Sequence, residues 1–142
     1  MSDDKIIHVG VACLIFKNGQ VLLGKRVSKT HGNGEYGCGG GHAEYGENLS
    51  DAVRREIEEE WKIKISTPKF LCLTNIVKYG KHFIDVGFTA DWLSGEPSPE
   101  DEGEFSEFDW YNLDGTPTPL FGAIPNYFES IKTGRTYFET IE

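Results

Sequence analysis

Residues 41–63 read GHAEYGENLSDAVRREIEEEWKI, and this stretch decides the fold. From Leu49 to Trp61 the apolar side chains recur at helical spacing. Asn48 is the predicted N-cap, with Asp51 as its capping partner three residues further on. The preceding segment, Thr30 to Gly41, is rich in glycine and shows no apolar period. We therefore predict a glycine-rich loop that leads into one clear helix.

Three carboxylates of this helix lie on or beside the stripe that should face the core. At about 100° per residue, Glu56 and Glu60 fall inside the apolar stripe and Glu59 lies at its edge. A like-charge pair four residues apart costs roughly a few tenths of a kcal/mol when exposed, and much more when buried. The alternatives are a solvated run of charge or compensation by basic groups, for which Arg55 alone is insufficient. Converging carboxylate oxygens suit Mg²⁺ or Mn²⁺, so we predict a divalent metal site.

The composition places the chain among globular proteins. Its 142 residues suit one domain, 1–142, and 38% hydrophobic with 13% aromatic residues is enough for a core. A net charge of −9 disfavours nucleic-acid polymers and anionic membranes as partners. Three widely spaced cysteines, Cys13, Cys38 and Cys72, indicate reduced thiols. With neither a basic signal-peptide start nor a long apolar run, the sequence predicts a cytoplasmic protein.

The remaining elements follow from local signals. Strands are expected where aliphatic and aromatic residues concentrate, at residues 6–16, 21–26, 70–79, 82–92 and 105–111. Asn18-Gly19 is a strong hairpin signal, and Gly80 should join the next strand pair. Residues 94–103 form an acidic loop, and a second helix is expected over 125–132, ending before Gly134. Together these elements predict one α/β domain with a mixed sheet.

The glycine-rich loop also contains a misleading motif. Gly32 to Gly37 matches GxGxxG, the fingerprint of dinucleotide-binding domains. That fingerprint opens directly into a helix, whereas here more glycine follows. We therefore reject a Rossmann interpretation.

Residues 41–63 resemble the Nudix box. Its pattern is Gly, five residues, Glu, seven residues, Arg-Glu, an aliphatic, any residue, Glu-Glu, any residue, Gly and an aliphatic. Eight of these nine positions are matched, by Gly41, Glu47, Arg55, Glu56, Ile57, Glu59, Glu60 and Ile63. The departure is Lys62 in place of the last Gly, which costs about 1–2 kcal/mol if that position is left-handed. Gly39 stands where many relatives have Pro.

The resemblance implies a Nudix fold over the whole chain, with a mixed β-sheet sandwiched between α-helices. It implies an acid-anhydride hydrolase that cleaves a nucleoside diphosphate linked to another moiety with Mg²⁺ or Mn²⁺. By position, Glu56, Glu59 and Glu60 would hold the metal, while Glu47 and Arg55 keep loop and helix in register. A further acidic ligand would be Glu104, with Glu107 as the second choice. Glu56 would deprotonate the attacking water, with Glu104 as the alternative.

Beyond the box, residues 21–26 (VLLGKR) and 116–121 (TPTPLF) resemble MutT-type nucleoside triphosphate hydrolases. This similarity implies conversion of a (d)NTP and water to a (d)NMP and pyrophosphate, as in sanitising of the nucleotide pool. Arg26, or else Lys25, would bind phosphate, and Gly40 and Gly41 would lie against the substrate. The candidates for base contacts are His31, Asn75, Tyr79, His82 and Phe121.

Two other functions stay open at this point. The chain could hydrolyse a nucleotide sugar, ADP-ribose or a dinucleoside polyphosphate, or it could be a non-catalytic Nudix-fold sensor. The intact acidic set argues against the sensor, because a binding module has no need of carboxylates on a core-facing stripe. The expected partner is a small-molecule nucleotide and not a nucleic-acid polymer or a membrane, and the chain is expected to be a monomer or a homodimer.

Overall fold

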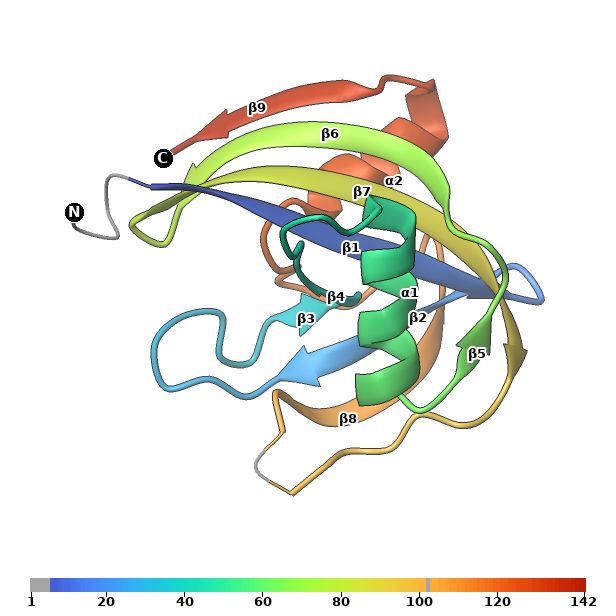
Figure 1. The fold of residues 1–142 in the computed structure, drawn as a ribbon. Coiled ribbons are helices and arrows are strands. Elements are labelled where there is room, and N and C mark those ends of the chain that lie inside the picture. The colour runs from blue at the N-terminus through green and yellow to red at the C-terminus, as the bar shows by residue number, and fades with distance from the viewer. Residues whose placement is uncertain (1–5, 102) are drawn as a thin grey trace.

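The computed structural model describes residues 6–101 and 103–142, and a mixed sheet forms its centre. The main strand order is β3-β2-β1-β7-β6-β9, while β4 pairs with β1, β5 with β7 and β8 with β2 (Figure 1). The strands are β1 (Ile7–Lys17), β2 (Gln20–Arg26), β3 (Tyr36–Gly37), β4 (Gly39–His42), β5 (Lys64–Ile65), β6 (Lys69–Lys78), β7 (Lys81–Ser94), β8 (Phe105–Asn112) and β9 (Tyr137–Ile141). β1 runs parallel to β7, and β6 parallel to β9; the other pairs are antiparallel.

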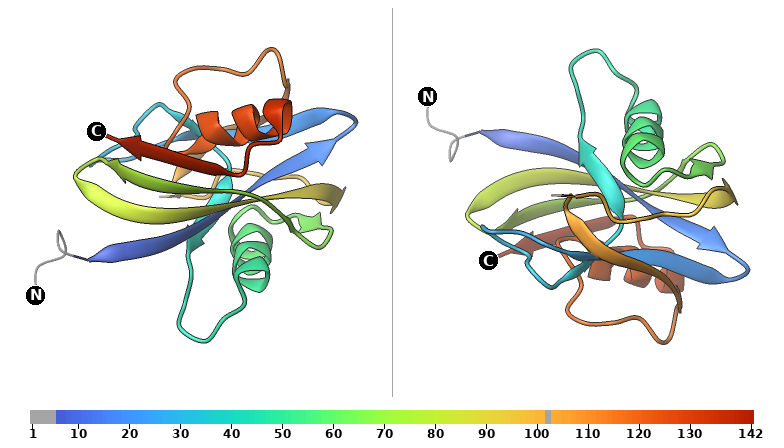
Figure 2. Two further views of the ribbon diagram at one scale, coloured as in Figure 1. Left: turned by 90° about the horizontal axis from the view of Figure 1, so that it is seen from above. Right: turned by 90° about the horizontal axis from the view of Figure 1, so that it is seen from below.

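Two helices cover opposite faces of this sheet. Figure 2 shows α1 (Leu49–Glu60) on one side and α2 (Ile124–Thr133) on the other. Successive side chains of a strand point to opposite faces, so β1 contributes to both cores. Cys13 and Ile15 pack in the core beneath α1, and Leu14 packs in the core beneath α2. The predicted mixed sheet between helices is therefore confirmed.

Both predicted hairpins form at residues that adopt left-handed backbone angles. The β1–β2 turn has φ of 51° at Asn18 and 79° at Gly19. The β6–β7 turn has φ of 57° at Tyr79 and 74° at Gly80. Two consecutive residues with positive φ match the right-handed twist of the flanking strands, which is why these short turns are favoured.

The prediction of one continuous loop over residues 30–41 is wrong in part, because β3 and the start of β4 lie inside it. The GxGxxG stretch leads into β3 and not into a helix. In β4, Gly40 pairs with Ala12 of β1, and a Cβ on Gly40 would lie 2.2 Å from the Val11 carbonyl oxygen. Glycine is therefore needed here for close strand approach. Strands β5 and β9 were also not predicted.

The ends of α1 differ from the predicted capping. Asn48 occupies the N-cap position, but within the described residues it makes no side-chain capping bond; its Nδ2 instead donates to Asp51 Oδ2 at 3.2 Å. At the other end Lys62 adopts φ of 58°, the left-handed angle expected where the Nudix box has glycine. Its Nζ donates to the Glu59 carbonyl at 2.6 Å and lies 3.1 Å from Glu100 Oε1. These contacts offset part of the backbone strain at Lys62.

Three further predictions concern the chain as a whole. In the described part of the chain the three cysteines are buried and form no disulfide. Neither α1 nor α2, nor any other helix within residues 6–101 and 103–142, is long and apolar enough to cross a membrane. The N-terminal segment that argued against a signal peptide, residues 1–5, lies outside the described residues.

The strained backbone at Lys62 generates a first prediction. Replacing Lys62 by Gly or by Ala removes the same amine contacts, but only Gly adopts φ of 58° without a Cβ penalty. We expect Lys62→Gly to be more stable than Lys62→Ala by about 1 kcal/mol. Urea unfolding of both variants measures this difference. Equal free energies of unfolding would contradict the left-handed conformation.

Candidate active site

The glycines of β4 bring the carboxylate-bearing face of α1 against the sheet. A Cβ on Gly39 would lie 2.7 Å from Ile57 Cγ1, and a Cβ on Gly41 would lie 2.8 Å from Glu56 Cδ. Real Cβ atoms do not approach so closely, so these contacts need glycine. The Glu56 carboxyl, whose side chain is 15% exposed, therefore rests directly on the β4 backbone.

Arg55 holds the adjoining acidic side chains. Its Nε and NH2 donate to both oxygens of Glu47, at 2.9 and 3.1 Å, and its NH1 donates to Glu56 Oε1 at 3.0 Å. This pairing lowers the pKa of Glu47 and raises the pKa of Arg55. Glu44 and Glu59 lie at 3.7 and 3.8 Å from the same guanidinium. Arg55 thus connects the loop at Glu47 to the helix and bonds to Glu56.

Glu60 and Glu104 complete an acidic cluster with Glu56. Burial raises the pKa of Glu60 to about 7, together with a hydrogen bond to Glu56 and the negative charges of Glu56 and Glu104. Glu60 and Glu104 also line one small cavity of about 160 Å³. The Glu104 carbonyl accepts a bond from the Val27 backbone N–H at 2.7 Å, which fixes this loop beside the end of β2. The cluster therefore contains carboxylates from helix α1 and from the loop before β8.

The donor set fits a hard divalent cation by its chemistry. Its members are carboxylate oxygens, the ligands that hard divalent cations prefer. Within the described residues, no three His, Cys, Asp or Glu side chains lie close enough together in this conformation to hold a metal ion. Glu59 points outward, with 65% of its side chain exposed. Glu56, Glu60 and Glu104 form one carboxylate cluster, and the metal-binding role expected for them and for Glu59 stays a prediction.

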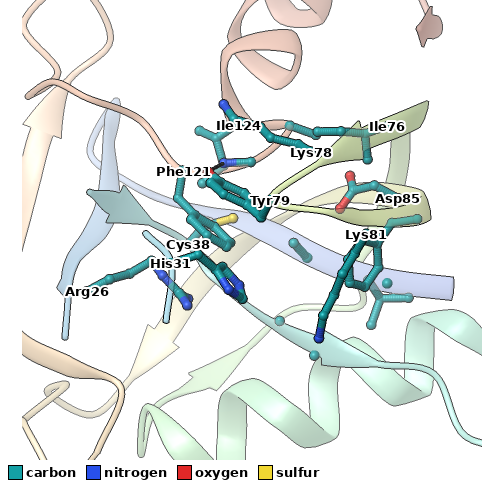
Figure 3. Close-up of a pocket in the computed structure, with 18 of the residues that line it drawn as sticks. Arg26, His31, Cys38, Ile76, Lys78, Tyr79, Lys81, Asp85, Phe121 and Ile124 are labelled. Atoms are coloured by element: carbon teal, nitrogen blue, oxygen red, sulfur yellow. Dashed lines mark hydrogen bonds between the residues drawn. The ribbon is translucent and has the colours of Figure 1, made fainter. Parts of the chain in front are cut away.

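Next to the acidic cluster lies a cavity of about 410 Å³, a size typical of small-molecule sites. Gly40, Gly41 and Glu104 form one part of its lining. Aromatic rings form another: Tyr79 stacks on Phe121 with centroids 5.3 Å apart, and His31 stacks on Tyr79 at 4.8 Å. Figure 3 shows these rings between Arg26 on one side of the cavity and Asp85 on the other.

Arg26 is a half-buried cation in the cavity wall. Its guanidinium carbon lies 3.8 Å from the centre of the Phe121 ring. Burial lowers the pKa of Arg26, although the negative charges of Glu104 and Glu35 oppose this effect. The buried Nε has no hydrogen-bond partner among the described residues. Arg26 is thus held by stacking and retains donors for an anionic ligand.

The structure separates the candidate base contacts into two groups. His31, Tyr79 and Phe121 line the cavity, whereas Asn75 and His82 do not; these two bond to each other at 2.6 Å. The second choices Lys25 and Glu107 pair in register across β2 and β8, away from the cavity lining.

Sequence reasoning missed Asp85 and Tyr127, which also line the cavity. The available signal for Asp85 was a lone carboxylate in a strand of otherwise mainly apolar residues, 82–88. Tyr127 carried no such signal, because a tyrosine on a helix usually indicates packing.

Comparisons with known proteins agree with this architecture. A model of the NUDIX domain matches residues 6–130. A MutT NUDIX hydrolase from Burkholderia pseudomallei superposes with a TM-score of 0.82 at 30% identity, covering 89% of this chain and 99% of that one. A MutT protein from Methanosarcina mazei Go1 gives 0.77 at 26% identity, covering 94% and 98%.

A curated relative has a different name and is much longer. The "NAD-capped RNA hydrolase NudC" of Stutzerimonas stutzeri is 28% identical over 126 residues, which are 86% of this chain and 43% of that protein. The chain spans less than half the length of the curated relatives it matches first.

The Arg55 network generates a second prediction. Arg55→Lys keeps the charge but cannot form the two parallel bonds to Glu47, so the melting temperature should fall. Glu47→Gln should lower it as well. The matched control is Glu58→Gln, which affects a peripheral pair with Lys64 at 3.4 Å and should change the melting temperature little. Differential scanning calorimetry measures all three, and a drop of equal size in the control would contradict the assigned role of Arg55.

Proposed function

Because the chain belongs to the NUDIX domain family, we propose that it is a pyrophosphohydrolase that converts nucleoside triphosphates to nucleoside monophosphates and pyrophosphate. The observation that carries this proposal is the cavity itself. It places a half-buried cation, Arg26, and an aromatic wall beside a cluster of carboxylates. A single nucleotide offers the matching groups: a flat base, and phosphates that bind both an arginine and a carboxylate-held metal.

In the proposed reaction, some residues bind the metal and the substrate, and others accept a proton. Glu56, Glu60 and Glu104 would hold Mg²⁺ or Mn²⁺, which when bound polarises a phosphoryl oxygen and lowers the pKa of a water. Arg26 binds a phosphate oxygen and neutralises its charge, and Gly40 and Gly41 let the substrate approach the β4 backbone. Glu56 accepts the proton of the attacking water, with Glu104 as the alternative base. The water oxygen bonds to phosphorus, and pyrophosphate leaves.

The substrate class is tested with a panel of purified compounds. The (d)NTPs should release pyrophosphate at higher kcat/KM than NAD, ADP-ribose, nucleotide sugars or dinucleoside polyphosphates. The name of the relative from Stutzerimonas stutzeri justifies including NAD. Phosphorus NMR of the products distinguishes pyrophosphate release from cleavage into two monophosphates. Faster hydrolysis of any non-triphosphate would overturn the proposed substrate but not the family.

The acidic cluster generates a third prediction. Glu56→Gln and Glu60→Gln should each lower kcat by about 10²–10⁴-fold with Mg²⁺, and excess chelator should abolish turnover of the unmodified protein. Glu58→Gln, on the opposite side of α1, should retain activity. A circular dichroism spectrum of each variant establishes that it is folded. Full turnover in chelator would show that the carboxylates do not act through a metal.

Arg26 generates a fourth prediction. Arg26→Ala removes a charge-assisted contact to phosphate, so kcat/KM for the best triphosphate should fall about ten- to a hundredfold. Lys25→Ala is the matched control, because Lys25 precedes Arg26 on the same strand but does not line the cavity. Mn²⁺ affinity measured by calorimetry should stay unchanged in both variants. A loss below threefold in Arg26→Ala would make Arg26 a packing residue only.

A further inference from the structure

The side of the cavity away from Arg26 carries a partly buried carboxylate, Asp85, whose orientation is fixed by a neighbouring side chain. Asp85 of β7 faces the cavity there, and the Tyr127 hydroxyl of α2 donates a hydrogen bond to Asp85 Oδ2 (Figure 3). Tyr127 is 1% exposed. A Cβ on Gly87 would lie 2.7 Å from Tyr127 Cε1 and Cζ, so the glycine makes room for the ring. Tyr127 therefore fixes the orientation of the Asp85 carboxylate.

The second oxygen of Asp85 is available to a ligand. Asp85 Oδ1 lies 3.9 Å from the position of a Cβ on Gly10, a residue that also lines the cavity. Within residues 6–101 and 103–142 no side chain or ion pair engages Oδ1. Burial raises the pKa of Asp85 to about 6, opposed by the bond from Tyr127. A partly buried carboxylate with one oxygen not engaged by a side chain favours an N–H donor from whatever enters the cavity.

The charges of the cavity fix the direction of a bound nucleotide. Arg26, Lys78 and Lys81 line the cavity and attract the phosphates, whereas the Asp85 carboxylate repels them. The aromatic side chains Tyr79 and Phe121 lie between the two (Figure 3). A nucleotide with its phosphates toward Arg26 and Gly41 consequently places its base toward Asp85.

We propose that Asp85, oriented by Tyr127, binds the base edge and selects a base with two neighbouring N–H donors. This inference rests on the proposed function. A carboxylate accepts hydrogen bonds but does not donate them, so the free Oδ1 and the remaining lone pair of Oδ2 pair best with two adjacent donors. Among the common bases guanine has this edge, through N1–H and the 2-amino group. Hypoxanthine lacks the amino group, and adenine sets a donor beside an acceptor, which the carboxylate repels.

The first test measures binding in chelator, by calorimetry with GMP, IMP and AMP. GMP should bind about tenfold more tightly than IMP, and AMP more weakly than either. In Asp85→Asn the ratio of GMP to IMP affinity should fall to about one. The matched control is Asp91→Asn, which changes an exposed carboxylate on the same strand and should keep the ratio. Equal affinities of the unmodified protein for GMP and IMP would overturn the proposal.

Tyr127→Phe separates recognition from a structural role. The ring stays in place, but Asp85 loses its orienting hydrogen bond, so the GMP preference should fall several-fold. If Asp85→Asn and Tyr127→Phe lower only the melting temperature and leave the ratio intact, the pair is structural and the proposal is wrong. If Asp85→Asn does not fold, the ratio of GMP to IMP affinity in the unmodified protein and in Tyr127→Phe still tests the proposal.

Turnover distinguishes this inference from the function on which it rests. With Mg²⁺, kcat/KM should be about tenfold higher for GTP than for ITP, and Asp85→Asn should remove that difference. Hydrolysis of both triphosphates at equal kcat/KM overturns the role of Asp85 and leaves the proposed function standing. Selective GMP binding that depends on Asp85, without hydrolysis of any triphosphate, supports base recognition and overturns the proposed function.

Discussion

The rest of the site depends on one steric constraint, the contact between α1 and β4. A helix can press a carboxylate against a strand only where the strand carries no side chains, and Gly39 and Gly41 meet that condition at Ile57 and Glu56. The apolar contact at Ile57 anchors the helix, and the contact at Glu56 places a negative charge beside the cavity. Arg55 then offsets part of the electrostatic cost, because it bonds Glu47 and Glu56 together. Packing and chemistry are thus set by the same pair of adjacent helix residues.

Sequence patterns could predict the elements whose signals are local. The helix at 49–60 and the hairpin at Asn18-Gly19 each follow from spacing or from turn residues that tolerate positive φ. Strand β4 could not be found this way, because its glycines are explained by close approach to β1 and α1 and not by any strand periodicity. Strand β9 pairs with β6 across more than 60 residues of chain, and its five residues carry no comparable signal. The pairing of strands that are distant in the sequence is visible only in the folded structure.

For the site, spacing could predict which carboxylates of α1 share a face, but not their surroundings. Glu56 and Glu60 do lie together, yet only the structure shows that Glu59 is exposed and that Glu104 joins them. Alternation along β6 and β7 could not decide which polar residues reach the cavity. Asn75 and His82 satisfy each other, whereas Asp85 enters the cavity with Tyr127 behind it. In a protein of net charge −9, Arg26, Lys78 and Lys81 thus line a cavity beside the acidic cluster.

The hydroxyl of Tyr79 makes two hydrogen bonds beside the cavity. It donates to Glu35 Oε1 at 2.8 Å and accepts from the Gly122 backbone N–H at 3.1 Å. One oxygen atom therefore ties the turn between β6 and β7 to the segment before β3 and to the segment before α2. Outward movement of the turn breaks both hydrogen bonds, whereas movement of either segment breaks only its own bond to Tyr79. A single side chain thereby holds together three segments beside the cavity.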